Sequence, residues 1–301
     1  MNEHFSMDRG NSNSKGESLW HSQNFLRDPQ FVASLVDIAD ISSHDTVIEI
    51  GPGKGIITEQ LSRKADRVIA IEYDNELVQG LREKFSDSSN VEILGADFLK
   101  WSLPNNKYKV FSNIPFEYTS RIIDKLLVSS NPPEDTFLIM QDLAAKRFMG
   151  KFAGGEDSQM SILLQPFYSM NILRRIDRNQ YTPTPNVNTV LGHFMKKEYP
   201  LIENKNTQEY RDFVIYGYNQ WKPTLLEAFK DVFSYNQTKI IKKNLKLEGK
   251  KPSDLDVNTW VALFKTYQKY VPQERKFQVK GSEERLNKSQ QRMKKRYRTR
   301  K

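Results

Sequence analysis

The stretch Thr46-Val-Ile-Glu-Ile-Gly-Pro-Gly-Lys-Gly55 decides the fold of this 301-residue chain. Its first five residues form a β-branched run, which is typical of a buried strand. Glycines at alternate positions, Gly51, Gly53 and Gly55, then predict a tight loop that a ligand can approach closely. An amphipathic segment follows and predicts a helix. The stretch therefore indicates the strand, loop and helix that open a βαβ unit.

Further short apolar runs on the C-terminal side predict more strands, and most are separated by amphipathic, helix-like segments. The expected strands are 67–72, 91–94, 108–112 and 136–140, and residues 172–176 and 190–195 pair as a closing hairpin-like element. Strands that alternate with helices predict a mostly parallel sheet, in which ligands bind at the carboxyl ends of the strands. The expected fold class is α/β with a Rossmann-like sheet.

Beyond about residue 200 the strand pattern stops and helical spacing takes over. Val257, Trp260, Phe264 and Tyr267 recur at intervals of three or four and predict one apolar helix face. We therefore expect a small, all-helical C-terminal domain. The expected segments are a disordered start (1–18), an α/β domain (19–199), a helical domain (200–272) and a basic disordered tail (273–301).

Composition excludes several kinds of chemistry. The chain has no cysteine, so disulfides, thiolate nucleophiles and cysteine-ligated zinc are excluded. Its four histidines are scattered, so we expect no metal site. No apolar run is long enough to cross a bilayer, and the first twenty residues lack the apolar core of a secretory signal. We expect a cytoplasmic protein that acts as a monomer.

The positive charge is confined to one end of the chain. Residues 273–301 contain twelve Lys or Arg and three Glu, which equals the net charge of +9 of the whole chain. A basic tail on a neutral body suggests a polyanionic partner. A solubilising tail without a specific partner is the alternative.

The glycine loop is followed by carboxylates at the ends of two later strands. A phosphate-binding P-loop requires GxxxxGK[ST], and a dinucleotide site requires a third glycine at position 56, which is Ile. The GxGxG form suits an adenosyl ligand without a pyrophosphate, although a tight turn alone remains open. Glu72 lies where a carboxylate can accept hydrogen bonds from ribose hydroxyls, and Asp97 could accept from an adenine amine.

The segment Asn113-Ile114-Pro115-Phe116 follows the fourth expected strand. An adenine amine is a poor nucleophile because its lone pair is delocalised into the ring. The Asn113 side-chain oxygen and the Ile114 carbonyl could hold both of its N–H groups and favour a pyramidal nitrogen. Pro115 stiffens the loop, and Phe116 offers a face on which an extruded base can stack. An ordinary loop with a core Phe is the alternative.

Taken in order, QNFL (23–26), GPGKG, IEYD, GADF, SNIPF and Tyr181-Thr-Pro-Thr-Pro-Asn-Val187 resemble the rRNA adenine N6-methyltransferases. The resemblance runs from about residue 19 to 271. Ser22-Gln23-Asn24-Phe25 and the Ile of NIPF are more similar to the erythromycin-resistance branch, which acts on 23S rRNA. The small-subunit branch more often has Gly before QNF and Leu in NLPY.

This resemblance implies a Rossmann-like, S-adenosyl-L-methionine-dependent methyltransferase sheet. It implies a base sandwiched between Phe116 and Tyr181, where the family usually has Phe at the second position. The residues expected to bind the cofactor are Asn24, Leu26, Gly51, Gly53, Glu72, Asp97 and Asn113.

The resemblance thus implies that domain 19–199 binds the cofactor and carries catalysis and that the helical domain 200–272 binds RNA. The expected function is N6-methylation of one adenine in 23S rRNA, with the basic tail 273–301 holding part of the RNA. Within the family this modification confers resistance to macrolide, lincosamide and streptogramin B antibiotics. Two alternatives remain: a small-subunit rRNA adenine dimethyltransferase that acts in ribosome biogenesis, and a non-enzymatic RNA-binding or ribosome-assembly protein on the same fold.

Overall fold

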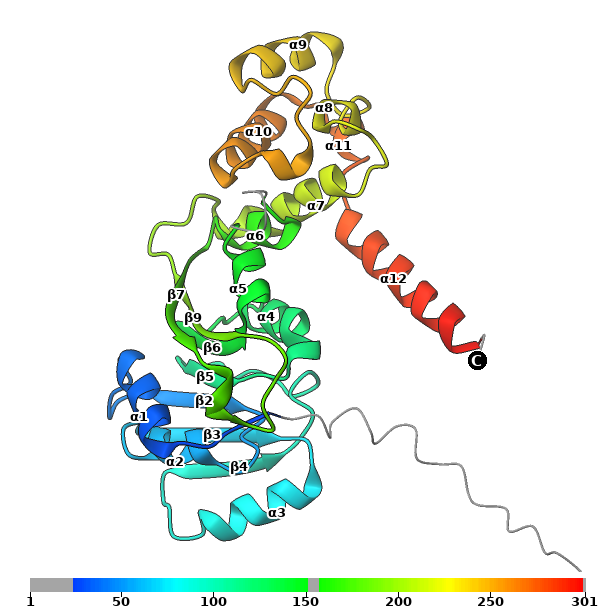
Figure 1. Ribbon diagram of the computed structural model, residues 1–301. Helices are drawn as coiled ribbons and strands as arrows, with labels where there is room; N and C mark the ends of the chain where they lie inside the picture. The colour runs from blue at the N-terminus through cyan, green and yellow to red at the C-terminus, as the bar shows by residue number, and fades with distance from the viewer. Residues whose placement is uncertain (1–23, 151–156, 300–301) are drawn as a thin grey trace, which may run out of the picture.

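A seven-stranded sheet with helices on both faces forms the lower part of the molecule, and a helical part stands above it (Figure 1). The computed structural model describes residues 24–150 and 157–299, except the side chains of 291 and 293–299. The expected disordered start, 1–18, lies outside these residues. The strands are β1 (Phe25–Leu26), β2 (Thr46–Ile50), β3 (Arg67–Glu72), β4 (Val91–Gly95), β5 (Lys109–Asn113), β6 (Asp135–Gln141), β7 (Tyr168–Ile176), β8 (Tyr181–Thr182) and β9 (Thr189–Lys196).

The described helices fall into two groups along the chain. Those of the α/β part are α1 (Pro29–Ile38), α2 (Ile56–Ser62), α3 (Asn75–Lys84), α4 (Thr119–Leu127), α5 (Asp142–Phe148) and α6 (Gln159–Leu164), with a 3-10 turn, η1 (Phe116–Tyr118), before α4. Those that follow the last strand are α7 (Thr207–Tyr218), α8 (Leu225–Ala228), α9 (Tyr235–Asn244), α10 (Val257–Tyr270), α11 (Gln273–Lys276) and α12 (Ser282–Thr299).

The strand order of the sheet is β4-β3-β2-β5-β6-β9-β7. The first five strands in this order are parallel, whereas β9 runs antiparallel to both β6 and β7. The α/β prediction, with its closing hairpin-like pair, is therefore confirmed. The carboxyl ends of β2 to β6 meet at one edge of the sheet, which is where such sheets bind ligands.

Alternation along the strands gives each face of the sheet its own core. On β2, Ile48 and Ile50 face a core that α4 and α5 cover, whereas Val47 faces a core that α1 and α2 cover. This is the period-two pattern expected of a strand buried on both faces. Helix α3 begins after Asp74, whose side chain caps it by accepting hydrogen bonds from two backbone amides.

The helical part has an aromatic core of its own. Phe213, Phe229 and Trp260 pack together there, and a Cβ on Gly217 would lie only 2.7 Å from Trp260. The apolar face predicted for α10 packs into this core. Helix α6 contributes to both parts, because Ile162 and Leu163 belong to the aromatic core and the next residue, Leu164, belongs to the core of the sheet.

The prediction of disorder for residues 273–301 is wrong for the part that the structure describes. Residues 273–276 form α11 and residues 282–299 form α12. Side chains of α7 hold the start of α12: Arg211 pairs with Glu283, and Asp212 accepts hydrogen bonds from the amides of Gly281 and Glu283 at 2.8 and 2.9 Å. Composition favoured disorder because it does not reveal these long-range partners.

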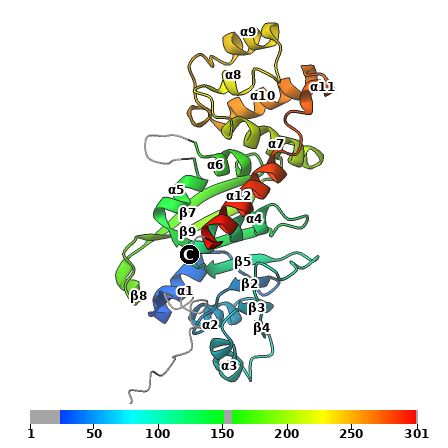
Figure 2. The same ribbon diagram turned by 90° about the vertical axis from the view of Figure 1, so that its right-hand side faces the viewer.

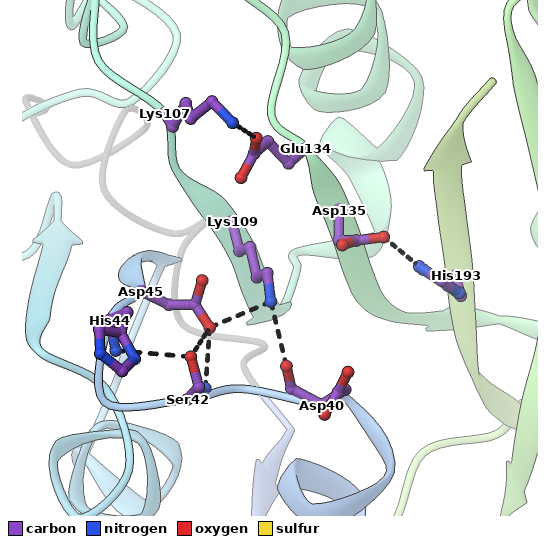
Figure 3. A network of polar contacts seen from close by, with 9 residues as sticks. All are labelled: Asp40, Ser42, His44, Asp45, Lys107, Lys109, Glu134, Asp135 and His193. Carbon is purple, nitrogen blue, oxygen red and sulfur yellow. Dashed lines mark hydrogen bonds and ion pairs between the residues drawn. The ribbon is translucent and has the colours of Figure 1, made fainter. Parts of the chain in front are cut away.

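A network of polar contacts lies at the amino ends of β5 and β6, opposite the ligand-binding edge (Figure 3). The Lys109 ammonium donates to the Asp45 carboxylate and to the Asp40 carbonyl, both at 3.0 Å. Burial raises the pKa of Asp45, but hydrogen bonds from Ser42 and Lys109 outweigh this effect and leave the pKa below 3.8. His193, one of the scattered histidines, lies at this edge and pairs with a β6 carboxylate.

Replacing Lys109 by Met should lower the free energy of unfolding at pH 7 by about 1–3 kcal/mol, because Asp45 loses a partner while mostly buried. Since the folded-state pKa of Asp45 is depressed, this stabilisation is present above pH 3.8 and is lost as the pH falls through that pKa. Urea unfolding at several pH values measures it. Lys107→Met is the control, because the Lys107–Glu134 pair is exposed and contributes little. Equal losses in both variants would contradict the prediction.

Candidate active site

The loop after β2 depends on its three glycines. Gly51, Gly53 and Gly55 have φ angles of +67°, +58° and +76°, in the left-handed region that other residues rarely adopt. Two of them are also crowded: a Cβ on Gly53 would lie 2.6 Å from the Phe25 ring, and one on Gly55 would lie 2.8 Å from Leu81. The loop therefore packs close to its neighbours and turns the chain directly into α2.

Glu72, at the end of β3, holds this loop in place. Its carboxylate is almost completely buried, and one oxygen accepts a hydrogen bond from the Gly53 amide at 3.1 Å. The other oxygen accepts from the amides of Tyr73 and Asp74 at 2.7 and 3.0 Å. A carboxylate offers about four lone-pair sites, so Glu72 can also accept from a ligand hydroxyl in the adjoining cavity.

Glu49, on β2, is a second buried carboxyl group close to the loop. Burial raises its pKa to about 8, against the effect of a 2.6 Å hydrogen bond from the Thr58 hydroxyl, and the charge of Glu72 raises it further. Glu49 is therefore mostly protonated at neutral pH. It faces Thr58 on α2 and does not line the cavity, so the structure favours a role in holding the loop.

Asn113, the last residue of β5, presents a buried acceptor. Its side-chain amide nitrogen donates to the Asn24 carbonyl at 3.2 Å. Its Oδ1 atom is buried and has no hydrogen-bond partner among the described residues. Buried polar atoms are nearly always paired, so this oxygen is suited to a donor that a ligand brings. The Ile114 amide, bonded to the Ile139 carbonyl at 3.2 Å, ties the loop to β6.

A cavity of about 580 Å³, here called the strand-end cavity, opens at the carboxyl ends of β2 to β6. The loop after β2, the ends of β3 to β5, the turn η1 and the first turn of α4 line it. The sequence-predicted residues that line it are Asn24, Gly51, Glu72, Asp97, Asn113, Ile114, Pro115 and Phe116. Eight residues chosen from the sequence therefore come together around one cavity.

Three expected site residues do not line the cavity. Tyr181 is 1% exposed, packs in the core under α1 and bonds through its hydroxyl to Thr189 at 2.8 Å, so the predicted Phe116–Tyr181 sandwich is wrong. Leu26 pairs with Tyr181 through β1 and β8 and is buried in the same core. Gly53 contributes its backbone amide, which donates a hydrogen bond to the Glu72 carboxylate. The second half of the 181–187 segment, Pro185 to Val187, reaches the cavity instead.

Other cavity residues were not among the predicted site residues. Phe25 and Phe98 adjoin predicted residues, so proximity in sequence could have indicated them. Gln141 ends β6, and its position at a strand end was the available signal. Arg121 lies on the first turn of α4, on the cavity side, and no motif marks it.

The residues present fit an adenosyl ligand. The cavity combines acceptors for hydroxyl and amine groups, Glu72 and Asp97, with apolar side chains such as Ile50, Ile71 and Phe98. The glycine loop beside it lacks the third glycine of a pyrophosphate site. The unpaired Asn113 oxygen lies on the same wall, where a second molecule would react. Fold and site together define an S-adenosylmethionine-dependent methyltransferase.

Comparison with known proteins specifies the substrate class. The family model described as "Ribosomal RNA adenine dimethylase" matches residues 18–269. An rRNA adenine N-6-methyltransferase of Bacillus licheniformis is 32% identical over 269 residues, covering 87% of this chain and 92% of that protein. A ribosomal RNA small subunit methyltransferase A of Mycoplasmopsis pulmonis is 31% identical over 224 residues, or 73% and 85% of the two chains. The chain belongs to the ribosomal RNA adenine dimethylase family and is an rRNA adenine methyltransferase.

Two solved structures share the fold. The 23S rRNA methyltransferase ErmE matches with a TM-score of 0.72 at 24% identity, over 82% of this chain and all of that one. A dimethyladenosine transferase from Plasmodium falciparum matches with a TM-score of 0.68 at 22% identity, over 81% and 98% of the two chains. The resemblance seen in the sequence motifs is thus confirmed at the level of the family and the fold.

The described residues contain neither a metal-binding cluster nor a membrane-spanning helix. No group of three or more His, Cys, Asp or Glu side chains there could hold a metal ion. Likewise, none of the helices between residues 24 and 299 is both long enough and apolar enough to span a membrane.

Glu49→Gln should change how stability depends on pH. The folded state keeps a proton on Glu49 up to about pH 8, whereas the unfolded chain releases it near pH 4.5, so wild-type stability falls as the pH rises between these values. The glutamine variant should lack this fall, which is on the order of a few kcal/mol because one pKa unit corresponds to about 1.4 kcal/mol. Urea unfolding at pH 5, 6.5 and 8 measures it.

Glu59→Gln is the matched control, because Glu59 lies on α2 with a solvent-accessible side chain, and this variant should follow the wild-type curve. A glutamine variant at position 49 with an unchanged pH slope would show that Glu49 ionises normally in the folded protein.

Proposed function

We propose that this enzyme methylates N6 of one adenine in 23S rRNA and thereby confers resistance to macrolide, lincosamide and streptogramin B antibiotics. Ser22-Gln23-Asn24-Phe25 and Ile114, which resemble the erythromycin-resistance branch, support this choice over the small-subunit RNA. The Bacillus relatives named rRNA adenine N-6-methyltransferase are 31–32% identical over 87% of the chain, whereas relatives named ribosomal RNA small subunit methyltransferase A are 26–31% identical over 68–82% of it. The proposal places the enzyme in the cytoplasm, as a monomer.

The unpaired Oδ1 of Asn113 carries the proposed chemistry. Its amide nitrogen is engaged by the Asn24 carbonyl, so the side chain is held with its oxygen available as an acceptor. In the proposed complex this oxygen and the Ile114 carbonyl accept the two hydrogens of the adenine amine. These contacts favour a pyramidal nitrogen, whose lone pair can then point at the methyl group.

Phe116 is proposed to hold the extruded base. It opens η1, is half-buried and lines the strand-end cavity. Extruding an adenine costs a few kcal/mol, and stacking on an aromatic ring returns about 1–3 kcal/mol. The base is thus held with its amine beside Asn113.

Bound S-adenosylmethionine supplies an electrophilic methyl group. The adenine nitrogen forms a bond to the methyl carbon as the carbon–sulfur bond breaks, its electron pair stays on sulfur, and the nitrogen loses one proton to water. Glu72 and Asp97 are proposed to accept hydrogen bonds from the ribose hydroxyls and the adenine amine of the cofactor. Orienting two reactants in this way can contribute about 7–11 kcal/mol to lowering the barrier.

Asn113→Ala should reduce methyl transfer at least about 100-fold, because the amine loses the acceptor that positions it. Binding of the cofactor should be weaker but measurable. Single-turnover assays with labelled cofactor measure the transfer step, and equilibrium dialysis measures binding. Glu117→Gln, an exposed residue at the edge of the same cavity, is the control and should retain transfer. Near-normal turnover in the Asn113 variant would contradict the assigned role.

The target should be found by methylation of purified 23S and small-subunit rRNA in separate reactions with labelled cofactor. We expect incorporation into 23S rRNA, at a single adenine when the product is mapped by nuclease digestion. Incorporation only into small-subunit rRNA would favour the alternative that the Mycoplasmopsis relative represents. Expression in a macrolide-sensitive host, with the Asn113→Ala variant as control, tests resistance.

A further inference from the structure

Helix α12 lies beyond the part of the chain that the family model matches, which ends at residue 269. Its 18 residues span about 27 Å at 1.5 Å per residue. Both of its acidic residues, Glu283 and Glu284, are in the first turn. From Arg285 to the last residue, Lys301, the sequence has nine Lys or Arg and no acidic residue.

The start of α12 is fixed by a buried network on α7. Arg211 is 4% exposed, and its guanidinium donates to Glu283 of α12 and, at 3.1 Å, to Asp124 of α4. Gln208 donates to Glu283 at 2.9 Å. Asp212, 5% exposed, accepts from two amides at the helix start. Breaking buried, charge-assisted contacts of this kind is costly, so they set the direction in which α12 leaves the protein.

Past this anchor, few of the described side chains of α12 contact the rest of the protein. Leu286 contacts the aromatic core of the helical part. The described side chains that follow, 287–290 and 292, are all exposed. Most helices in proteins are stabilised by burying an apolar face, whereas none of the described side chains of α12 beyond Leu286 is buried. An exposed, basic helix of this kind fits a polyanionic partner.

The direction of α12 brings its charge to the side of the molecule that carries α4. It descends from α7 on the side of α4 and slants outward from the α/β part (Figure 1), and seen from that side it passes in front of α4 (Figure 2). The turn before α4 and the first turn of α4 form a wall of the strand-end cavity through Tyr118, Arg121 and Ile122. Asp124, which contacts the anchor, lies one helical turn from Arg121.

We infer that α12 is a rigid basic arm that binds the sugar-phosphate backbone of the rRNA next to the target adenine. The inference rests on the proposed function for the identity of the RNA. The contacts of Arg211 and Asp212 fix the start of α12, so the basic residues of the arm approach the RNA from a fixed direction. The partner is a folded rRNA segment long enough to contact both the arm and the strand-end cavity.

The charge of the arm is tested by replacing Lys294, Lys295, Arg296 and Arg298 together by Gln. Binding to a 23S rRNA transcript should weaken about tenfold or more at physiological salt, and the slope of log affinity against log salt should fall by up to about 3. The turnover number at saturating RNA and the affinity for the cofactor should not change. A matched control removes four charges from exposed pairs at the opposite edge of the sheet: Arg63, Lys64, Arg67 and Lys107, each to Gln.

The rigidity of the arm is tested at Ser289, an exposed residue in its middle. Ser289→Pro interrupts the helix but keeps every charge, and Ser289→Ala keeps the helix. The proline variant should bind the transcript several-fold more weakly than the alanine variant. A short hairpin that contains only the target adenine and its nearest neighbours should be methylated equally by both, because it does not reach the arm.

If the proline and alanine variants bind the transcript equally, the inference that the arm is rigid is wrong. If the two four-residue variants lose equal RNA affinity, the inference that α12 is the RNA-binding element is wrong. If wild-type enzyme fails to methylate 23S rRNA, the proposed function fails. The arm is then tested by the same binding series on small-subunit rRNA, where an unchanged salt slope in the charge variant would overturn it.

Discussion

The buried carboxylate of Glu72 is the contact on which the arrangement of the site depends. It accepts hydrogen bonds from Gly53, in the loop after β2, and from two amides that follow β3, so one side chain fixes two neighbouring loops. In the loop with three glycines at positive φ, the amide of the middle glycine, Gly53, thus has a buried carboxylate as its acceptor. Glu72 lines the strand-end cavity, and so does Asn113 on β5, which β2 separates from β3.

The sheet could be predicted from the sequence because its strands are local, apolar runs of the length that a buried strand requires. The positions of Glu72, Asp97 and Asn113 could be predicted for the same reason, since a parallel sheet brings its strand ends to one edge. The positions of Tyr181 and Leu26 could not be predicted, because whether they face the cavity or the core depends on the register of β1 against β8, two short strands more than 150 residues apart in sequence.

Helix α12 shows a different limit of sequence reasoning. Its composition is that of a disordered tail, since it offers little apolar surface to bury. Its first turn is ordered by Arg211 and Asp212, about 70 residues earlier in the chain. The two glutamates of that turn could be recognised afterwards as suited to a helix start, but their partner could not be identified without the fold. The raised pKa of Glu49 could not be predicted from the sequence either, because it results from the burial of the side chain between β2 and α2.

Helix α6 couples the two parts of the enzyme to each other. Its consecutive residues Ile162, Leu163 and Leu164 belong to two different cores, so the helical part cannot swing away from the sheet without exposing one of them to water. We therefore expect the two parts to unfold together and to move as one rigid body rather than as two domains on a hinge. In the proposed complex, RNA bound by the helices would thereby keep a fixed position relative to the strand-end cavity.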